Sequence, residues 1–152
     1  MDPNLLIVPP FDEQRAFIAV FSAWFISQII KTVWRPKNRP KGLKWIYETG
    51  GMPSSHSATV SCLATTMGLY YGFQSMIFLM SLIFSMIIMF DAAGVRRNMG
   101  RQAKVLNQMI DEFSRKGAFG EDRLKELLGH TPVEVFAGAF LGIVIAYLFC
   151  GL

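Results

Sequence analysis

Four stretches of the 152-residue chain are apolar over the length that a membrane-spanning helix needs. A bilayer span takes roughly 20 predominantly apolar residues, and the stretches that fit are about 16–33, 55–73, 75–93 and 133–152. Their interiors hold no charged residue, and only 17% of the chain is charged, against about a quarter in soluble domains. The sequence therefore predicts a single-domain, all-α polytopic membrane protein, residues 1–152, with about four transmembrane helices.

Two longer segments, about 34–54 and 94–131, separate these spans. The first is rich in Pro, Gly and basic residues and is expected to be irregular. The second contains apolar residues at helical spacing, namely Val105, Leu106, Met109, Ile110 and Phe113. This spacing predicts an amphipathic helix that either covers the functional site or lies in the headgroup layer. We expect a short helix after it that ends at Gly129.

The positive charges are distributed unevenly between the two sides of such a four-span bundle. Fourteen of the 15 Lys and Arg residues fall in or beside the two long segments, and only Arg15 falls on the other side. Cytoplasmic loops of membrane proteins carry the excess of Lys and Arg. We therefore expect both segments to be cytoplasmic and both termini to lie on the opposite side of the membrane.

The two histidines stand at the starts of two spans. His56 follows Pro53 and Ser54 in "GGMPSSHSA", and His130 precedes Pro132 in "HTPVEVFAGAFLG"; Pro is favoured at the first position of a helix. Both helices then run inward from the same face, so their positive ends point into one layer and suit an anion. The plainer alternative is that Ser54 merely caps a helix and that His56 happens to lie in its first turn.

Each histidine also heads a row of residues, mostly small, at four-residue spacing. The rows are His56, Val60, Ala64, Gly68 and Gly72 in the second span, and His130, Glu134, Gly138, Gly142 and Ala146 in the fourth. Small residues at this spacing let membrane helices approach closely. If the two rows face each other, they bring the histidines at their heads together.

Glu134 has two interpretations that the sequence leaves open. As the third residue after Thr131 it completes a capping box, in which its carboxylate only reaches back to the start of the helix. As the fourth residue after His130 it can instead bind one ring nitrogen, fix the tautomer and leave the other nitrogen to attack. A nucleophilic and an acidic histidine together predict a bell-shaped pH dependence of activity.

Basic residues near the end of the third span are candidates for holding a phosphate. A guanidinium binds phosphate through two parallel hydrogen bonds, and Arg96, Arg97 and Arg101 supply such groups. Taken one at a time, these arginines also fit ordinary cytoplasmic anchors. Asp91, at the end of the same span, is expected to pair with one of them or to have a purely structural role.

These residues resemble the motifs of a known superfamily. "PSSH" is similar to the "PSGH" motif of the type-2 phosphatidic acid phosphatase and vanadium haloperoxidase superfamily, and "HTPVEVFAGAFLG" is similar to its final motif. The whole chain resembles the divergent branch of that superfamily. The resemblance implies that His130 is the nucleophile that forms a phosphohistidine, oriented by Glu134 in place of the usual Asp. It further implies that His56 is the general acid, that Ser54 binds phosphate, and that no metal or other cofactor is needed.

The chain departs from the superfamily pattern at several positions. The first motif has Lys seven residues before Arg-Pro, whereas Lys31 lies four before Arg35 and eight before Arg39. Leu124 occupies the place of an Arg six residues before the nucleophile, and Ser55 stands in place of Gly. The expected phosphate-binding residues are therefore Arg97, Arg96, Arg101, Lys31, Ser54 and Ser55.

The function expected from these features is a membrane phosphatase. Its substrate would be a lipid phosphate, or a related amphiphilic phosphoester or diphosphate, met at the headgroup level of the bilayer. The alternative is a non-catalytic membrane protein that binds anionic headgroups or serves as a scaffold. We expect no nucleic-acid partner. A homo-oligomer stays open, because the superfamily core usually has more than four spans and a shortened core could need a second copy.

Overall fold

The computed structural model describes residues 12–34, 51–114 and 130–151. The elements in chain order are the helices α1 (Glu13–Val33), α2 (Ser55–Tyr71) and α3 (Met76–Phe90), the π-helix η2 (Asp91–Val95), and the helices α4 (Arg96–Ser114) and α5 (Pro132–Cys150). This confirms the prediction of a helical membrane protein. The irregular segment expected at about 34–54 lies mostly outside the described residues, and so does the short helix expected to end at Gly129.

The helix starts are set by local sequence. A side-chain oxygen accepts a backbone N–H of the first turn at four helices, and the capping residues are Asp12 for α1, Ser54 for α2, Ser75 for α3 and Thr131 for α5. Such caps satisfy N–H groups that have no partner within the helix.

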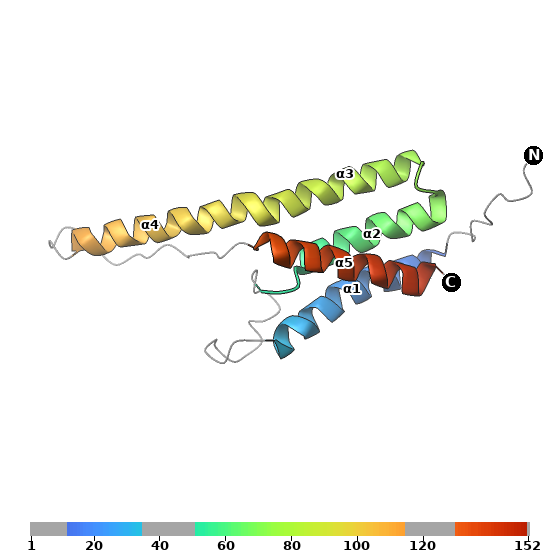
Figure 1. Ribbon diagram of the computed structural model, residues 1–152, viewed down its shortest axis with the longest axis horizontal. Coiled ribbons are helices and arrows are strands. Elements are labelled where there is room, and N and C mark those ends of the chain that lie inside the picture. Colours follow the sequence, from blue (N-terminus) through green and yellow to red (C-terminus); the bar gives the residue numbers. More distant parts are fainter. Residues whose placement is uncertain (1–11, 35–50, 115–129, 152) are drawn as a thin grey trace, which may run out of the picture.

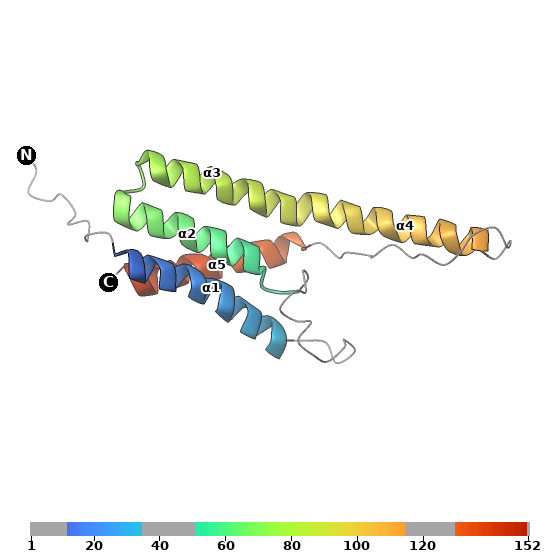
Figure 2. The ribbon, with the colours of Figure 1, turned by 180° about the vertical axis from the view of Figure 1, so that it is seen from behind.

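Helix α2 forms the centre of the bundle. It packs against α1, α3 and α5, and eleven of its 17 residues are buried. The chain runs along α1, back along α2 and forward again along α3, while α5 runs in the same direction as α2 (Figures 1 and 2). The end of α1, the starts of α2 and α5, and the passage from α3 into η2 therefore lie at one end of the bundle.

The backbones at the interface between α2 and α5 lie so close together that only glycine fits at two positions of α5. A Cβ added at Gly138 would overlap the Ser54 carbonyl oxygen, and one added at Gly142 would overlap the Ala58 carbonyl oxygen. The small-residue row predicted on α5 therefore does face α2. Backbones that approach this closely are typical of membrane helices with small residues at their interface.

The prediction of which α2 residues face α5 is wrong. The residues that a Cβ at Gly138 or Gly142 would meet are Ser54, Ser57, Ala58 and Cys62, not the row headed by His56. The Val60 carbonyl oxygen instead accepts a hydrogen bond from Ser85 of α3, and Gly68 lies against the ring of Phe73. Because α2 is buried on most of its circumference, small residues recur on more than one face and their spacing does not single out one neighbour.

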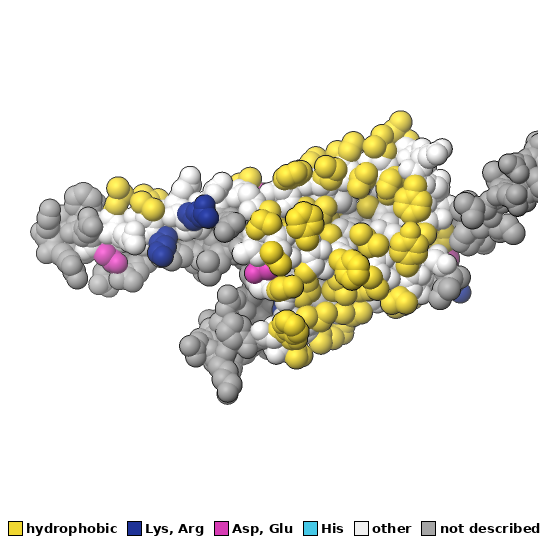
Figure 3. All heavy atoms as spheres, in the orientation of Figure 1, with side chains coloured by type: hydrophobic (Ala, Val, Ile, Leu, Met, Phe, Trp, Pro, Cys, Tyr) yellow, Lys and Arg dark blue, Asp and Glu magenta, His cyan; other side chains and the backbone are white. Residues whose placement is uncertain are grey.

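Three of the described segments are long and apolar enough to cross a membrane: Glu13–Val33, Met76–Asp111 and Pro132–Cys150. Helix α2 has 17 residues and carries several hydroxyl groups, so it does not reach these limits, and the four-span topology stays a prediction. Apolar side chains cover the visible face of the bundle, whereas the visible Lys and Arg side chains lie on α4 and at the opposite end of the molecule (Figure 3). The surface of the bundle is thus suited to lipid.

The predicted amphipathic helix is present as α4, but it is not a separate element. Helices α3 and α4 continue into each other through η2, and α4 extends beyond the end of the bundle (Figures 1 and 2). A π-helix inserts extra backbone into a turn and is frequent at functional sites. Here it lies beside the start of α5, where Ala92 of η2 accepts a hydrogen bond from the backbone N–H of His130, two residues before that helix.

Candidate functional site

The two histidines lie side by side at the end of the bundle where α2 and α5 begin. Their ring centroids are 6.4 Å apart, and the ring planes meet at 63°. A hydrogen bond of 2.9 Å from the Ser54 N–H to the Glu134 carbonyl oxygen ties the start of α2 to the first turn of α5. His130 is only 1% exposed, whereas His56 is exposed. The expected approach of the two histidines is therefore present, although through a different face of α2 from the one predicted.

Glu134 takes both of the roles that the sequence left open. Its Oε2 lies 3.0 Å from Nδ1 of His130 and accepts the backbone N–H of Thr131 at 3.1 Å. The Glu134 N–H in turn donates to the Thr131 hydroxyl at 3.4 Å, which completes the capping box. The same carboxylate oxygen thus caps the helix and holds the imidazole.

This geometry fixes how the His130 ring is protonated. A carboxylate only accepts hydrogen bonds, so Nδ1 carries the proton that it donates to Glu134. In the neutral ring Nε2 then holds the lone pair. Nε2 is the nitrogen that a nucleophilic histidine would use, and it points away from Glu134.

A third element holds the backbone of His130. The His130 N–H donates to the carbonyl oxygen of Ala92 in η2 at 3.2 Å, and Ala92 is buried. Sequence reasoning missed this contact, because the helical pattern around "DAAGV" does not reveal that a carbonyl is available there. Asp91 begins η2 and directly precedes Ala92.

Two of the expected phosphate ligands meet beside the histidines. Lys31, in the last turn of α1, donates from Nζ to the Ser55 hydroxyl at 2.9 Å across 24 residues of chain. Ser55 is the first residue of α2 and directly precedes His56. A cation and a hydroxyl are thereby held together at the positive end of a helix, which is an arrangement that suits a phosphate.

Ser54 acts as the helix cap. Its side chain is fully buried, and its Oγ accepts hydrogen bonds from the backbone N–H of Ser57 at 3.3 Å and from the Ser57 hydroxyl at 3.0 Å. Ser54 therefore caps α2, as the plainer alternative predicted. Its expected contact with phosphate stays a prediction.

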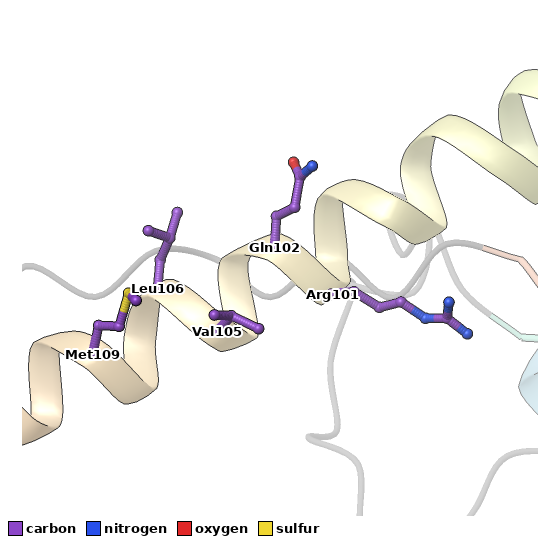
Figure 4. Close-up of a pocket in the computed structure, with 5 residues that line it drawn as sticks. All are labelled: Arg101, Gln102, Val105, Leu106 and Met109. Atoms are coloured by element: carbon purple, nitrogen blue, oxygen red, sulfur yellow. The ribbon is translucent and has the colours of Figure 1, made fainter.

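The arginines lie on α4. Arg96 and Arg97 are its first two residues and follow η2 directly. Arg101 is exposed farther along α4, and its side chain extends toward the end of the helix nearest the bundle (Figure 4). The structure thus places the backbone of Arg96 and Arg97 next to the η2 segment that binds His130.

Sequence reasoning also missed Gln28, which lies one turn before Lys31 on α1. Its side chain is 4% exposed, and its Oε1 has no hydrogen-bond partner among the described residues. An amide inside an otherwise apolar span was the available signal. Within residues 12–34, 51–114 and 130–151, no group of three or more His, Cys, Asp or Glu side chains could hold a metal ion.

Comparisons with known proteins agree with the resemblance stated above. The model of the Divergent PAP2 family matches residues 12–145. A protein of Bacillus subtilis (strain 168), the uncharacterized membrane protein YuiD, is 48% identical over 124 residues, which cover 70% of this chain and 78% of the relative. No solved structure matches the chain.

Proposed function

The chain belongs to the Divergent PAP2 family, and on that premise we propose that it is a membrane phosphatase that acts through a phosphohistidine intermediate. The proposed substrate is a lipid phosphate or a related amphiphilic phosphoester or diphosphate. The observation that carries the proposal is the His130 ring, which is held through Nδ1 by Glu134 and faces His56 at 6.4 Å between ring centroids.

The first step is attack on phosphorus. Nε2 of His130 gives its lone pair to phosphorus, and the bond from phosphorus to the leaving oxygen breaks. Protonated His56 delivers its proton to that oxygen, which leaves as an alcohol or as a phosphate. The phosphorylated ring keeps its proton on Nδ1 and is cationic, so the Glu134 carboxylate stabilises the charge that develops.

The second step is hydrolysis of the intermediate. His56, now neutral, takes a proton from water as the water oxygen attacks phosphorus. The bond between phosphorus and Nε2 of His130 breaks, which regenerates the neutral ring and releases inorganic phosphate. His56 ends protonated, ready for the next cycle.

The phosphate needs cations and donors in both steps. Lys31 and Ser55 are held together by their own hydrogen bond, and both can turn to a phosphate oxygen when one arrives. We propose that Arg97, with Arg96 and Arg101, supplies guanidinium contacts from α4. An ammonium cannot replace a bidentate guanidinium, so Arg97→Lys is expected to weaken vanadate binding while the protein stays folded.

The position of the site suits an amphiphilic substrate. The histidines lie where α2 and α5 begin, at the end of an apolar bundle, which supports a position near the headgroups of the bilayer. His56 is the exposed member of the pair, so substrate would enter from its side. The charge asymmetry of the chain supports a cytoplasmic site.

A second candidate function is binding of anionic headgroups without turnover. It is favoured by the absence of the Arg that is usual in the wider superfamily, whose place is taken by Leu124, and by the use of Ser54 as a cap. Such a protein would keep the cationic side chains and the helix N-termini that bind an anion, but it would not catalyse hydrolysis.

Phosphate release decides between the two functions. The purified full chain, in lipid nanodiscs, would be given a panel of lipid phosphates and diphosphates with and without vanadate. The phosphatase proposal expects release that vanadate inhibits, an acid-labile phosphoenzyme, and loss of both in His130→Ala. His56→Ala is expected to slow the hydrolysis of substrates with poor leaving groups far more than that of substrates with good ones, because only a poor leaving group needs a proton from the general acid. Headgroup binding with no release from any substrate would establish the scaffold instead.

A further inference from the structure

The rod formed by α3, η2 and α4 is longer than one bilayer span. Helix α3 has 15 residues and η2 has five, which is the length of about one bilayer span. The Arg96–Arg97 pair follows immediately. Because α4 continues along the line of α3 (Figures 1 and 2), a bilayer spanned by α3 and η2 would leave the side chains of α4 in the aqueous phase.

Helix α4 nevertheless carries an apolar seam. The seam consists of Val95, the last residue of η2, and of Met99, Gln102, Leu106 and Met109 on α4, which alternate at spacings of four and three residues. Its four apolar members are 46–56% exposed, and Figure 4 shows Gln102, Leu106 and Met109 on successive turns. Alternation of four and three is the heptad pattern of a helix that packs against another helix along its whole length.

Helix α3 has a seam with the same spacing. It consists of Met76, Met80, Ile83, Ile87 and Phe90, all of them exposed. At ~100° per residue, Ser85 lies about 180° from the centre of this seam. Ser85 donates a hydrogen bond to α2, so the seam of α3 faces directly away from the bundle.

The π-helix joins the two seams. The step from Phe90 to Val95 is five residues, one more than the heptad pattern requires. A π-helical turn accommodates one extra residue, because its hydrogen bonds run from i to i+5. Both seams therefore fall on the same side of the rod, whereas in an uninterrupted α-helix the extra residue would rotate them ~100° apart.

We propose that the seams of α3 and α4 together form the interface with a second copy of the chain. The α3–η2–α4 rods of the two copies would lie parallel and form a two-stranded coiled coil. Two copies in one bilayer share orientation and depth, so each residue of the seam meets its own counterpart about a two-fold axis. Gln102 would pair with Gln102 of the other copy, and a single polar residue in such a seam fixes the register. The proposal does not depend on the phosphatase activity, because the seam of α3 faces away from the bundle that holds the histidines.

The distances favour a second copy over the bilayer surface as the partner. At ~1.5 Å per residue, Leu106 and Met109 lie about 16 and 21 Å beyond Val95. The headgroup layer is only about 5–8 Å deep on each side. A helix that continues the line of a spanning helix therefore carries these side chains past the headgroups, where lipid cannot cover them.

Cysteine crosslinking in native membranes tests the pairing. In a background of Cys62→Ala and Cys150→Ala, single cysteines would replace Met99, Leu106 or Met109 on the seam. Lys104→Cys and Asp111→Cys are matched controls on the opposite face of α4. We expect about tenfold more disulfide-linked dimer at the seam positions than at the controls, because only seam residues meet across a coiled coil. Equal crosslinking at all positions would overturn the proposal.

The mass of the full chain in nanodiscs gives an independent readout. Leu106→Asp places a charge in the seam and is expected to convert the dimer to a monomer, while Lys104→Asp is expected to leave it a dimer. A dimer that survives Leu106→Asp would contradict the proposal. A fluorophore at Leu106 that is quenched by headgroup-attached quenchers, without crosslinking, would show that α4 lies on the bilayer and that the proposal is wrong.

Discussion

The double contact of Glu134 allows its charge to be tested separately from its shape. Its Oε2 accepts from the Thr131 N–H and from His130 Nδ1, at 3.1 and 3.0 Å. A backbone N–H can only donate, so in Glu134→Gln the amide must place its carbonyl oxygen at the Oε2 position. That oxygen still accepts from Nδ1, so the substitution keeps the cap and the tautomer and removes only the negative charge.

The expected loss follows from the difference between two kinds of hydrogen bond. A bond to a charged acceptor contributes about 1.5–3 kcal/mol and a neutral one about 0.5–1.5 kcal/mol. The phosphorylated His130 ring would thus lose about 1.4 kcal/mol of stabilisation, which is about tenfold in rate. Glu134→Ala also removes the orientation of the ring, and a histidine left in the wrong tautomer costs on the order of 10⁴ in rate.

The assay is kcat for phosphate release together with the thermal unfolding of each variant. Glu134→Gln is expected to unfold like the parent and to turn over about tenfold more slowly. Thr131→Ala is the matched control: it removes the hydroxyl of the capping box, should cost about 1 kcal/mol of stability, and should keep kcat. If Glu134→Gln has the parent's kcat, or if Thr131→Ala loses as much activity as Glu134→Ala, the carboxylate is a cap and not a partner of the nucleophile.

Other predictions follow from packing, burial and charge. Gly142→Ala should destabilise the fold by about 1–3 kcal/mol, because the added methyl forces α2 and α5 apart; Gly94→Ala, where an added methyl meets no atom within 4 Å, should not, and denaturant unfolding compares them. Gln28→Leu should stabilise the protein by about 1 kcal/mol, since it removes a buried acceptor that has no described partner, and a simultaneous fall in kcat would assign Gln28 to the site. Single cysteines at Lys41 and Arg115 should resist an impermeant reagent in intact cells, and ready labelling of both would overturn the cytoplasmic assignment.

Local sequence patterns predicted much of this structure. The apolar stretches gave helices close to the expected bounds, and Ser54 and Thr131 cap α2 and α5 as their residue types indicate. Capping depends on residues within one helical turn, so it can be read without knowledge of the fold. The pairing of His130 with Glu134 belongs to the same class, because residues four apart on a helix are neighbours.

Contacts between distant segments could not be predicted in this way. The choice of face on α2 failed because a helix buried on most sides has no single apolar stripe to identify its partner. The hydrogen bond from His130 to Ala92 depends on a π-helical turn that joins two helices. The bond from Lys31 to Ser55 joins the end of one helix to the start of the next, and only the resemblance to the superfamily pointed to that lysine.

The framework around the histidines explains how this chain can depart from the superfamily motifs and still bring its two histidines together. The starts of α2 and α5 are tied by main-chain bonds, from the Ser54 N–H to Glu134 and from the His130 N–H to Ala92. Such bonds do not depend on which side chains the phosphate-binding positions carry. Ser55, which replaces the usual Gly of the motif, adds a hydroxyl that Lys31 binds, and a glycine has no group to offer there. The departure from the motif thus changes which groups can meet the phosphate, while the two histidines stay together. Loss of a motif residue is therefore weaker evidence against activity than loss of either main-chain hydrogen bond would be.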